Sequence, residues 1–472
     1  MINNDLLILF IVIPLFFSFF PLIEKIKPAL KMSKAASLLS FILSTLLLAA
    51  FTAGISQGAE YKTVVGGWTI IAGISQRLDG ISWIGLALMY AVSFPSLLYS
   101  FSEKSYSSIF YFFFLVLHAG MAGMVLAYDI FNLFVFLEIT GICAYVLIAY
   151  TQKGKAVFAS FKYLMLSSLG ISLFLIAVFI IYFATGSLRF DDMPKLFSSI
   201  SSQSAPAAFA VAALIAGIGV RTAFIPYTWL PDAHAFAPHP VSAVLSGVVI
   251  KISFIVVWKL VTLLSLSEVR LFLLWMGCAI ALIGVIRALA QTDFKVLLAW
   301  HSVSQMGFIF AAFGAGTVLS VTGSMYHAIS HAFFKSLLFL SVSIVIIFSG
   351  ERSLERIRGA GKYLPAASIL FFIGALSITG IPPFTGYVSK KLIFSGLKDY
   401  PAAYLTLFIA SIGTVASFTK LSLIFRGKIS SAMKDKDAAI NTRRFTGGYA
   451  GMTILAIFCI AAGVFGTYIS RQ

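Results

Sequence analysis

Ionisable side chains interrupt several long apolar segments of this 472-residue chain. On membrane-insertion scales an isolated charge at bilayer depth costs roughly 2.5 to 3.5 kcal/mol, so such residues are usually paired and usually functional. The types present can carry protons or hold a neighbouring group ionised. The candidates for ion translocation are Glu138, Arg221, Lys251, His327, His331, Lys335 and Lys390.

Glu138 lies about ten residues from either end of its apolar segment, near the expected bilayer midplane. An unpaired carboxylate at that depth stays protonated, whereas a neighbouring cation favours the ionised form, so a movable cation would make a proton switch. Arg221 or a lysine could be that cation; the alternative is a static ion pair. Asp129, at the start of the same segment, is predicted to cap a helix N-terminus.

Lys251 lies well inside the next apolar run after Arg221. Burial favours the neutral amine, so a lysine there can take up and release a proton, which an arginine cannot do. Lys259 lies nearer the end of the run, and we expect its ammonium group to extend into the membrane interface.

His327, His331 and Lys335 recur at i, i+4 and i+8, so they share one face of a helix. Histidine exchanges protons near neutral pH, and the pattern favours a hydrated relay. Packed structural histidines and a metal site are the alternatives, although no HExxH motif or third ligand accompanies the pair. His118 and His301 stand alone and are expected to be structural.

Prolines break two of the apolar segments. Pro226 interrupts the stretch GIGVRTAFIPYTWLPDAHAFAPHPVSAVLSGVVIK (217–251), and Pro382 and Pro383 interrupt GIPPFTGYVSKKLIF, just before Lys390. Broken helices occur at membrane depth only where protein or a water-filled cavity satisfies the freed backbone groups. Paired interruptions are typical of transporters built from inverted repeats.

The composition, 60% hydrophobic and 11% charged, predicts an all-α polytopic membrane protein. The net charge of +17 does not indicate nucleic-acid binding, because Lys and Arg gather in loops between apolar segments. The three cysteines, Cys143, Cys278 and Cys459, are far apart and form no metal-binding motif. We therefore expect no cofactor and no metal in this chain, and any redox chemistry belongs to a partner.

Apolar stretches of about twenty residues predict about fourteen membrane helices. The first is not a signal peptide, because its n-region carries Asp5 and no cation. The expected ranges are 5–23, 35–55, 78–100, 107–127, 129–150, 157–184, 206–225 (continuing brokenly to about 236), 240–263, 269–290, 295–315, 317–348, 365–396 with a break, 402–425 and 446–468.

Basic residues fall in alternate loops, so the positive-inside rule places those loops in the cytoplasm and both termini outside it. The polar stretch 188–204 is expected along the interface, and the loop 428–444 is expected to be a solvated loop or a partner contact. The basic loop residues are Lys25, Lys27, Lys31, Lys34, Lys153, Lys155, Arg352, Arg356, Arg358, Lys362, Arg426, Lys428, Lys434, Lys436, Arg443 and Arg444.

The sequence resembles the antiporter-like membrane subunits shared by respiratory complex I, Mrp-type Na⁺/H⁺ antiporters and energy-converting hydrogenase and sulfur reductase complexes. The resemblance rests on TWLPDAHAFAPHPVSAVLSGVVIK, KVLLAWHSVSQMGFI, SHAFFKSLLFL, GIPPFTGYVSKKLIF and FLEITGICAYVLI. It implies two inverted five-helix repeats around a hydrophilic axis, with helices 1–3 in 1–105, the repeats in 106–265 and 266–427, and a cytoplasmic loop and last helix in 428–472.

By the resemblance, Glu138, Lys251 and Lys390 match the family's key residues of the fifth, eighth and twelfth helices, and Lys390 resembles the Mrp D-type branch. The chain departs from the family at Arg221, where a lysine is usual; an arginine can hold Glu138 ionised but cannot itself pass a proton.

We therefore expect a subunit of a larger prokaryotic plasma-membrane complex that moves H⁺ or exchanges it for Na⁺, with further membrane subunits as partners. The complex would be an antiporter or a redox-driven oxidoreductase. Two alternatives remain: a structural subunit whose path Arg221 locks, and a membrane enzyme using Asp232 and His234 as acid and base.

Overall fold

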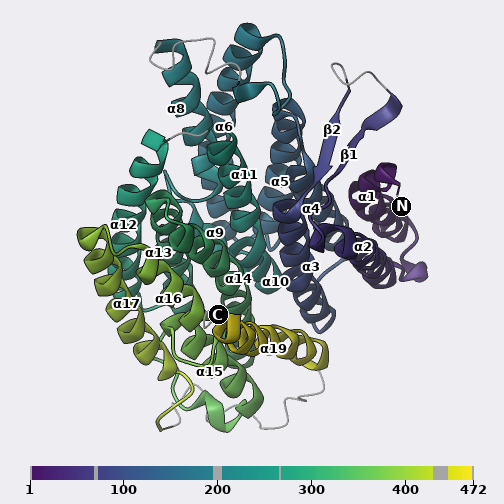
Figure 1. The fold of residues 1–472 in the computed structure, drawn as a ribbon. Coiled ribbons are helices and arrows are strands. Elements are labelled where there is room, and N and C mark those ends of the chain that lie inside the picture. The colour runs from purple at the N-terminus through teal and green to yellow at the C-terminus, as the bar shows by residue number, and fades with distance from the viewer. Residues whose placement is uncertain (1–2, 68–72, 195–204, 265–266, 429–444, 470–472) are drawn as a thin grey trace. The chain divides into compact units, whose positions relative to one another are not determined.

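The computed structural model describes residues 3–67, 73–194, 205–264, 267–428 and 445–469, and helices dominate them. Every expected apolar range overlaps a helix, and Figure 1 shows their order by colour. The first half contains α1 (Leu9–Ile26), α2 (Ser33–Ser56), α3 (Gly80–Phe101), α4 (Ser108–Leu126), α5 (Ile130–Ala149), α6 (Gly154–Thr185), α8 (Ala205–Arg221), α9 (Leu230–Phe236), α10 (His239–Val244) and α11 (Ile250–Leu263). The second half contains α12 (Ser267–Leu289), α13 (Phe294–Ala315), α14 (Val318–Ser349), α15 (Pro365–Thr379), α16 (Thr385–Gly396), α17 (Pro401–Ser422) and α19 (Thr446–Ile469).

Twelve helices of the described ranges are long and apolar enough to cross a membrane. Two shorter apolar helices, α8 and α15, each end at a break. The sequence predicts a helix to residue 225, but α8 ends at Arg221, before Pro226. The polar stretch expected along the interface lies outside the described residues from 195 onward, as does the loop 429–444.

The chain divides into two compact units. Unit 1 comprises Met1–Ala91, Lys104–Pro226 and Val249–Leu266, and unit 2 comprises Val92–Glu103, Tyr227–Val248 and Ser267–Gln472. In unit 1, α4 packs against α1, α2, α5 and α11, and α6 packs against α5 and α8. In unit 2, the long helix α14 packs against α10, α13, α15, α16 and α19, so its side chains are buried along most of its length. That central position explains why its polar residues lie in the interior.

Each unit contains a similar arrangement, here called a corner, in which residues at the N-terminus of one helix hydrogen-bond to the segment that follows the next helix. Asp129 caps α5 and Asp293 caps α13, while α6 and α14 both end at a glycine in the left-handed conformation, Gly186 and Gly350. Each residue of the first corner has its counterpart in the second corner the same number of residues further along the chain, as Asp129 has Asp293 and Gly186 has Gly350. In unit 1 the amides of Ile130 and Phe190 donate to the carbonyls of Leu188 and Tyr128, and in unit 2 the amides of Phe294 and Leu354 donate to the carbonyls of Arg352 and Thr292.

These corners support the internal repeat at the level of backbone hydrogen bonds. The inverted relation between the repeats stays a prediction, as do the domain boundaries at 105, 265 and 427.

Unit 1 also contains an antiparallel hairpin of β1 (Tyr61–Val64) and β2 (Ser75–Leu78). The sequence predicted only a loop there, since neither strand is long or strongly alternating. The hairpin lies at the N-terminal end of α1, because Asn4 donates to the Lys62 carbonyl and Thr63 donates to Asp5.

Candidate functional site

Unit 1 contains a direct ion pair between two helices. Nη2 of Arg221 donates to Oε1 of Glu138 at 3.0 Å. The arginine side chain is 4% exposed, whereas the glutamate side chain is 37% exposed. The expected pairing of a buried cation with the mid-helix carboxylate is therefore confirmed, and Arg221 is the cation.

Aromatic rings and a glycine surround the guanidinium. Arg221 lies 5.9 Å from the ring centroid of Tyr145, and the Tyr145 and Tyr163 rings meet edge-on at 4.9 Å. A Cβ on Gly141 would lie 2.2 Å from Nη1 of Arg221, so only glycine leaves the guanidinium in this place. The side chain is thus held on several sides.

The position of Arg221 is set by the end of α8, because Arg221 is the last residue of that helix. Ala223 adopts a left-handed backbone conformation, and the amide of Phe224 donates to the carbonyl of Gly219, which closes the helix end. A basic residue in the last turn also interacts favourably with the helix dipole. Helix termination and charge placement therefore depend on the same residues.

Lys251 is fully buried near the start of α11. It follows a π-helical turn, η4 (Leu245–Val249), of the kind often found at functional sites. The helix that carries it packs against α4 and against α8, the helix that ends at Arg221. Lys251 therefore lies in the interior, as the sequence predicted.

Unit 2 contains the histidine line on α14. The rings of His327 and His331 stack with centroids 6.4 Å apart, and both side chains are fully buried. Nδ1 of His327 lies 2.9 Å from Oγ of Ser389, and its Nε2 lies 3.0 Å from Oε1 of Gln305. The rings share a helix face, as the spacing predicted, and α13 and α16 contribute the polar partners of His327.

The two lysines of this part of unit 2 donate to backbone carbonyls. Nζ of Lys335 lies 2.5 Å from the carbonyl oxygen of Leu298. Nζ of Lys390 lies 3.4 Å from that of Thr379, the last residue of α15. The break between α15 and α16 leaves this carbonyl for the lysine, because no further helical turn covers it.

Sequence reasoning missed three residues that the fold brings into unit 2's polar interior, and it treated a fourth, His301, as a structural histidine that stands alone. Gln305 and Ser389 hold His327, and His301 interacts electrostatically with Lys335 and Lys390. Lys295 is buried and donates to the carbonyl of Ala237 at 2.7 Å. A signal existed for three of these residues, because Lys295, His301 and Gln305 all stand in KVLLAWHSVSQMGFI, a mainly apolar segment.

Three further predictions concern Asp129, Lys259 and the proposed acid–base pair of Asp232 and His234. Asp129 caps α5, accepting from the amide of Asn132 at 2.7 Å, which confirms its structural role. Lys259 donates to Ser82 and to the carbonyl of Val125, so its ammonium group is held by protein, and its expected position in the membrane interface stays a prediction. Burial also argues against the acid–base pair: His234 is fully buried and packs against Trp229 and Phe339.

No group of three or more His, Cys, Asp or Glu side chains in the described ranges could hold a metal ion. The three cysteines are buried and form no disulfide.

The fold and these interior charges define a multi-pass helical membrane protein with a polar interior in each unit. Residues 127–418 match the family model described as NADH:quinone oxidoreductase/Mrp antiporter, TM, and the chain belongs to this family.

Two relatives cover most of the chain. It is 31% identical over 382 residues to the N subunit of the NADH-quinone oxidoreductase of Desulforudis audaxviator, covering 77% of this chain and 75% of that protein. It is 29% identical over 433 residues to the D subunit of the Na⁺/H⁺ antiporter of Alkalihalophilus pseudofirmus, covering 89% and 86%. The similarity thus reaches both branches named in the family description.

Two solved structures share the fold across nearly the whole chain. A chain of the membrane-bound sulfane sulfur reductase, an archaeal respiratory membrane complex, superposes with a TM-score of 0.87 at 28% identity, covering 99% of this chain and 95% of that one. A chain of the Mrp complex from Dietzia sp. superposes with a TM-score of 0.86 at 23% identity and the same coverage.

Proposed function

We propose that this chain is an ion-translocating subunit of a larger membrane complex, moving H⁺ or exchanging it for Na⁺. The observation that carries the proposal is the 3.0 Å pair of Arg221 and Glu138 inside an apolar unit. The buried His327, His331 and Lys335 of unit 2 provide a second set of proton-exchanging groups. Membership of a family that includes Na⁺/H⁺ antiporter subunits supports the same function.

The mechanism we propose is ion-pair switching. Arg221 is always charged, so it can pair with Glu138 without exchanging a proton itself. At about 4 Å and an effective dielectric of about 20, two unit charges interact by about 4 kcal/mol. In the proposed mechanism, making or breaking this pair changes the electrostatic field inside the protein and with it the protonation of Lys251, and in turn that of the histidines and Lys390.

The exposure of Glu138 supports a partner subunit. A carboxylate with 37% of its side chain exposed on a membrane helix is costly against lipid, and a protein partner or water would relieve the cost. We propose that another membrane subunit covers this face of α5. The complex would lie in the plasma membrane of a prokaryote, and oxidoreductase activity, where present, would reside in its partners.

The test is proton flux through the native complex reconstituted in liposomes, driven by a potassium diffusion potential and followed with a trapped pH dye. Glu138→Gln and Lys251→Ala should each reduce flux at least tenfold while the complex still assembles. Addition of Na⁺ to one side distinguishes antiport from proton transport alone. Unchanged flux in both variants would end the proposal.

The alternative is a structural subunit whose path Arg221 locks, and the rings and glycine that enclose the guanidinium favour it. Arg221→Lys separates the two functions. Ion-pair switching requires only a cation at this position, so transport should be unchanged, whereas a large gain of transport would show that the arginine had closed the path.

A further inference from the structure

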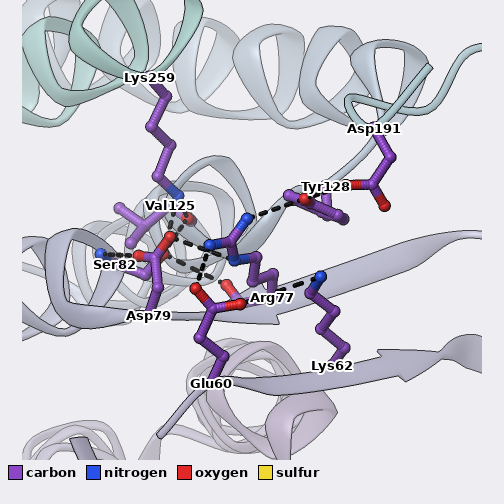
Figure 2. A network of polar contacts seen from close by, with 9 residues as sticks. All are labelled: Glu60, Lys62, Arg77, Asp79, Ser82, Val125, Tyr128, Asp191 and Lys259. Carbon is purple, nitrogen blue, oxygen red and sulfur yellow. Dashed lines mark hydrogen bonds and ion pairs between the residues drawn. The ribbon is translucent and has the colours of Figure 1, made fainter. Parts of the chain in front are cut away.

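A second network of charged groups lies at the hairpin end of unit 1, away from the Glu138–Arg221 pair. Figure 2 shows its members converging from the hairpin, the start of α3, the ends of α4 and α6, and α11. Arg77 is its centre: the guanidinium contacts Glu60 at 2.5 Å, Asp79 at 3.3 Å and the Tyr128 hydroxyl at 2.8 Å. The remaining charged members are Lys62, Asp191 and Lys259.

Lys259 connects this network to the packed helices α3, α4 and α11 of unit 1. Its ammonium group donates to Oγ of Ser82 at 2.8 Å and to the carbonyl of Val125 at 2.5 Å. It also interacts electrostatically with Asp79, whose carboxylate accepts the amide of Ser82 at 2.8 Å. Figure 2 shows the lysine descending from its helix onto Asp79, Ser82 and Val125.

The network forms a gradient of exposure from the surface inward. The Glu60 side chain is 46% exposed and those of Arg77 and Asp79 are 22% and 21% exposed, while Lys259 is partly buried. Burial alone raises the pKa of Asp79, but the charge of Lys259, the Ser82 hydrogen bonds and Arg77 outweigh burial and lower it. The ionised form of Asp79 is therefore favoured, and this carboxylate lies between the exposed Glu60 and Lys259.

On the other side of Lys259, the same helix leads to Lys251. The two lysines are eight residues apart on α11, so they share a helix face and are separated by about 12 Å along the axis. Ile255 lies between them on that face. A Cβ on Gly85 would lie 3.2 Å from Cδ1 of Ile255 and 3.1 Å from Cγ1 of Val125, so this apolar layer is closely packed.

We propose that Asp79 and Lys259 form a proton-exchange site at the hairpin end of unit 1, separated from Lys251 by the apolar layer at Ile255. In each cycle the proton passes through the Ser82 hydroxyl, which accepts from Lys259 at 2.8 Å and hydrogen-bonds Asp79. The N–H bond of the Lys259 ammonium and the O–H bond of Ser82 break, and O–H bonds form on Ser82 and on Asp79. The carboxylic acid then releases the proton to water at the hairpin, and the neutral amine takes up a new proton from the Lys251 side.

The charged and titratable groups that face this pair are Arg77 from β2, Glu60 beside β1, and Tyr128 and Asp191 around Arg77. The inference rests on the proposed function, because it assumes that protons reach Lys251. With the expected topology, the site faces the extracytoplasmic side. The competing account is a static anchor that ties the hairpin to α11.

Lys259→Arg in the reconstituted complex decides between the two. An arginine keeps the charge and can donate to Ser82 and Val125, but it does not release a proton. The exchange site predicts normal assembly and a flux at least tenfold lower, whereas wild-type flux would establish the static anchor. The matched control is Lys420→Arg, since Lys420 likewise donates two hydrogen bonds, to the carbonyls of Leu289 and Gln291, and flux should not change.

Asp79→Asn provides the second variant, and it decides the question if Lys259→Arg does not assemble. It should reduce flux at least tenfold and remove the dependence of the residual flux on hairpin-side pH, while Asp5→Asn, at the same end, should do neither. Wild-type flux in Asp79→Asn would overturn the exchange site. Unchanged flux in Lys251→Ala would instead contradict the proposed function, and a wild-type complex without flux would contradict both.

Discussion

The guanidinium of Arg221 occupies space that exists because residue 141 is a glycine. Gly141→Ala should displace the guanidinium and weaken the contact with Glu138, since the new Cβ would lie 2.2 Å from Nη1. The clash is with the end of a flexible side chain, so the folded protein should tolerate it. We expect flux through the reconstituted complex to fall about tenfold, the equivalent of about 1.4 kcal/mol, with normal assembly.

Gly154→Ala is the matched control, because a Cβ there has no neighbour within 4 Å. This substitution near the start of α6 should leave flux unchanged. If Gly141→Ala transports at the wild-type rate, the position of the guanidinium is not critical for function.

Asp79 predicts a pH dependence of stability with a definite sign. Its pKa is lowered in the folded state, so its contribution to the free energy of unfolding is fully present above the ordinary Asp value of about 3.9. The contribution declines as the pH falls below that value and is lost below the lowered pKa. Asp79→Asn should therefore destabilise the purified protein at pH 7, and the difference should shrink on acidification.

The measurement is the free energy of unfolding in detergent, from pH 7 down into the acid range. Glu355→Gln, an exposed carboxyl, is the control and should change stability little at any pH. A deficit in Asp79→Asn that stays constant with pH would contradict the electrostatic account of this carboxylate.

At the N-termini of α5 and α13, an aspartate side chain accepts hydrogen bonds from backbone amides that have no partner within the helix. Asp293 accepts from the amides of Lys295 and Val296 and pairs with Arg352 at 2.8 Å. Asp129 does the same for Asn132 and also accepts the amide of Ser75. Asp129→Ala and Asp293→Ala should each lower the free energy of unfolding by about 1 to 2 kcal/mol.

Asparagine at the same two positions is the informative comparison, because it retains capping and removes the charge. Asp129→Asn should recover most of the lost stability. Asp293→Asn should recover less, since the ion pair with Arg352 is absent. Equal recovery at both positions would mean that this ion pair adds nothing to the cap.

The distribution of basic residues predicts how the whole chain lies in the membrane. Cysteine introduced at Thr151, in an exposed loop beside Lys153, should react with an impermeant thiol reagent only from the cytoplasm. Cysteine introduced at Gln57, at the other end of unit 1, should react only from outside. The native cysteines are buried and give a low background. Reaction from the reverse sides would invert the topology.

Helix positions could be predicted closely because hydropathy and length are local properties. The ranges agree with the structure within a few residues, except at the end of α8, where the backbone turns before Pro226. The hairpin was missed, because four-residue strands carry too weak a pattern. The pairing of Glu138 with Arg221 was also foreseeable, since two opposite charges in an apolar protein must find partners.

The sequence by itself determined that this protein is helical, membrane-embedded and polar inside, because the cost of placing backbone and charge in lipid allows few other solutions. Only the tertiary structure decided which groups meet: Gln305 and Ser389 at His327, and Ser82 and Val125 at Lys259. Such partners come from helices that are distant in the sequence. A hydroxyl, an amide or a backbone carbonyl costs little free energy inside a helix, so it does not disturb the hydropathy pattern from which the helix is predicted.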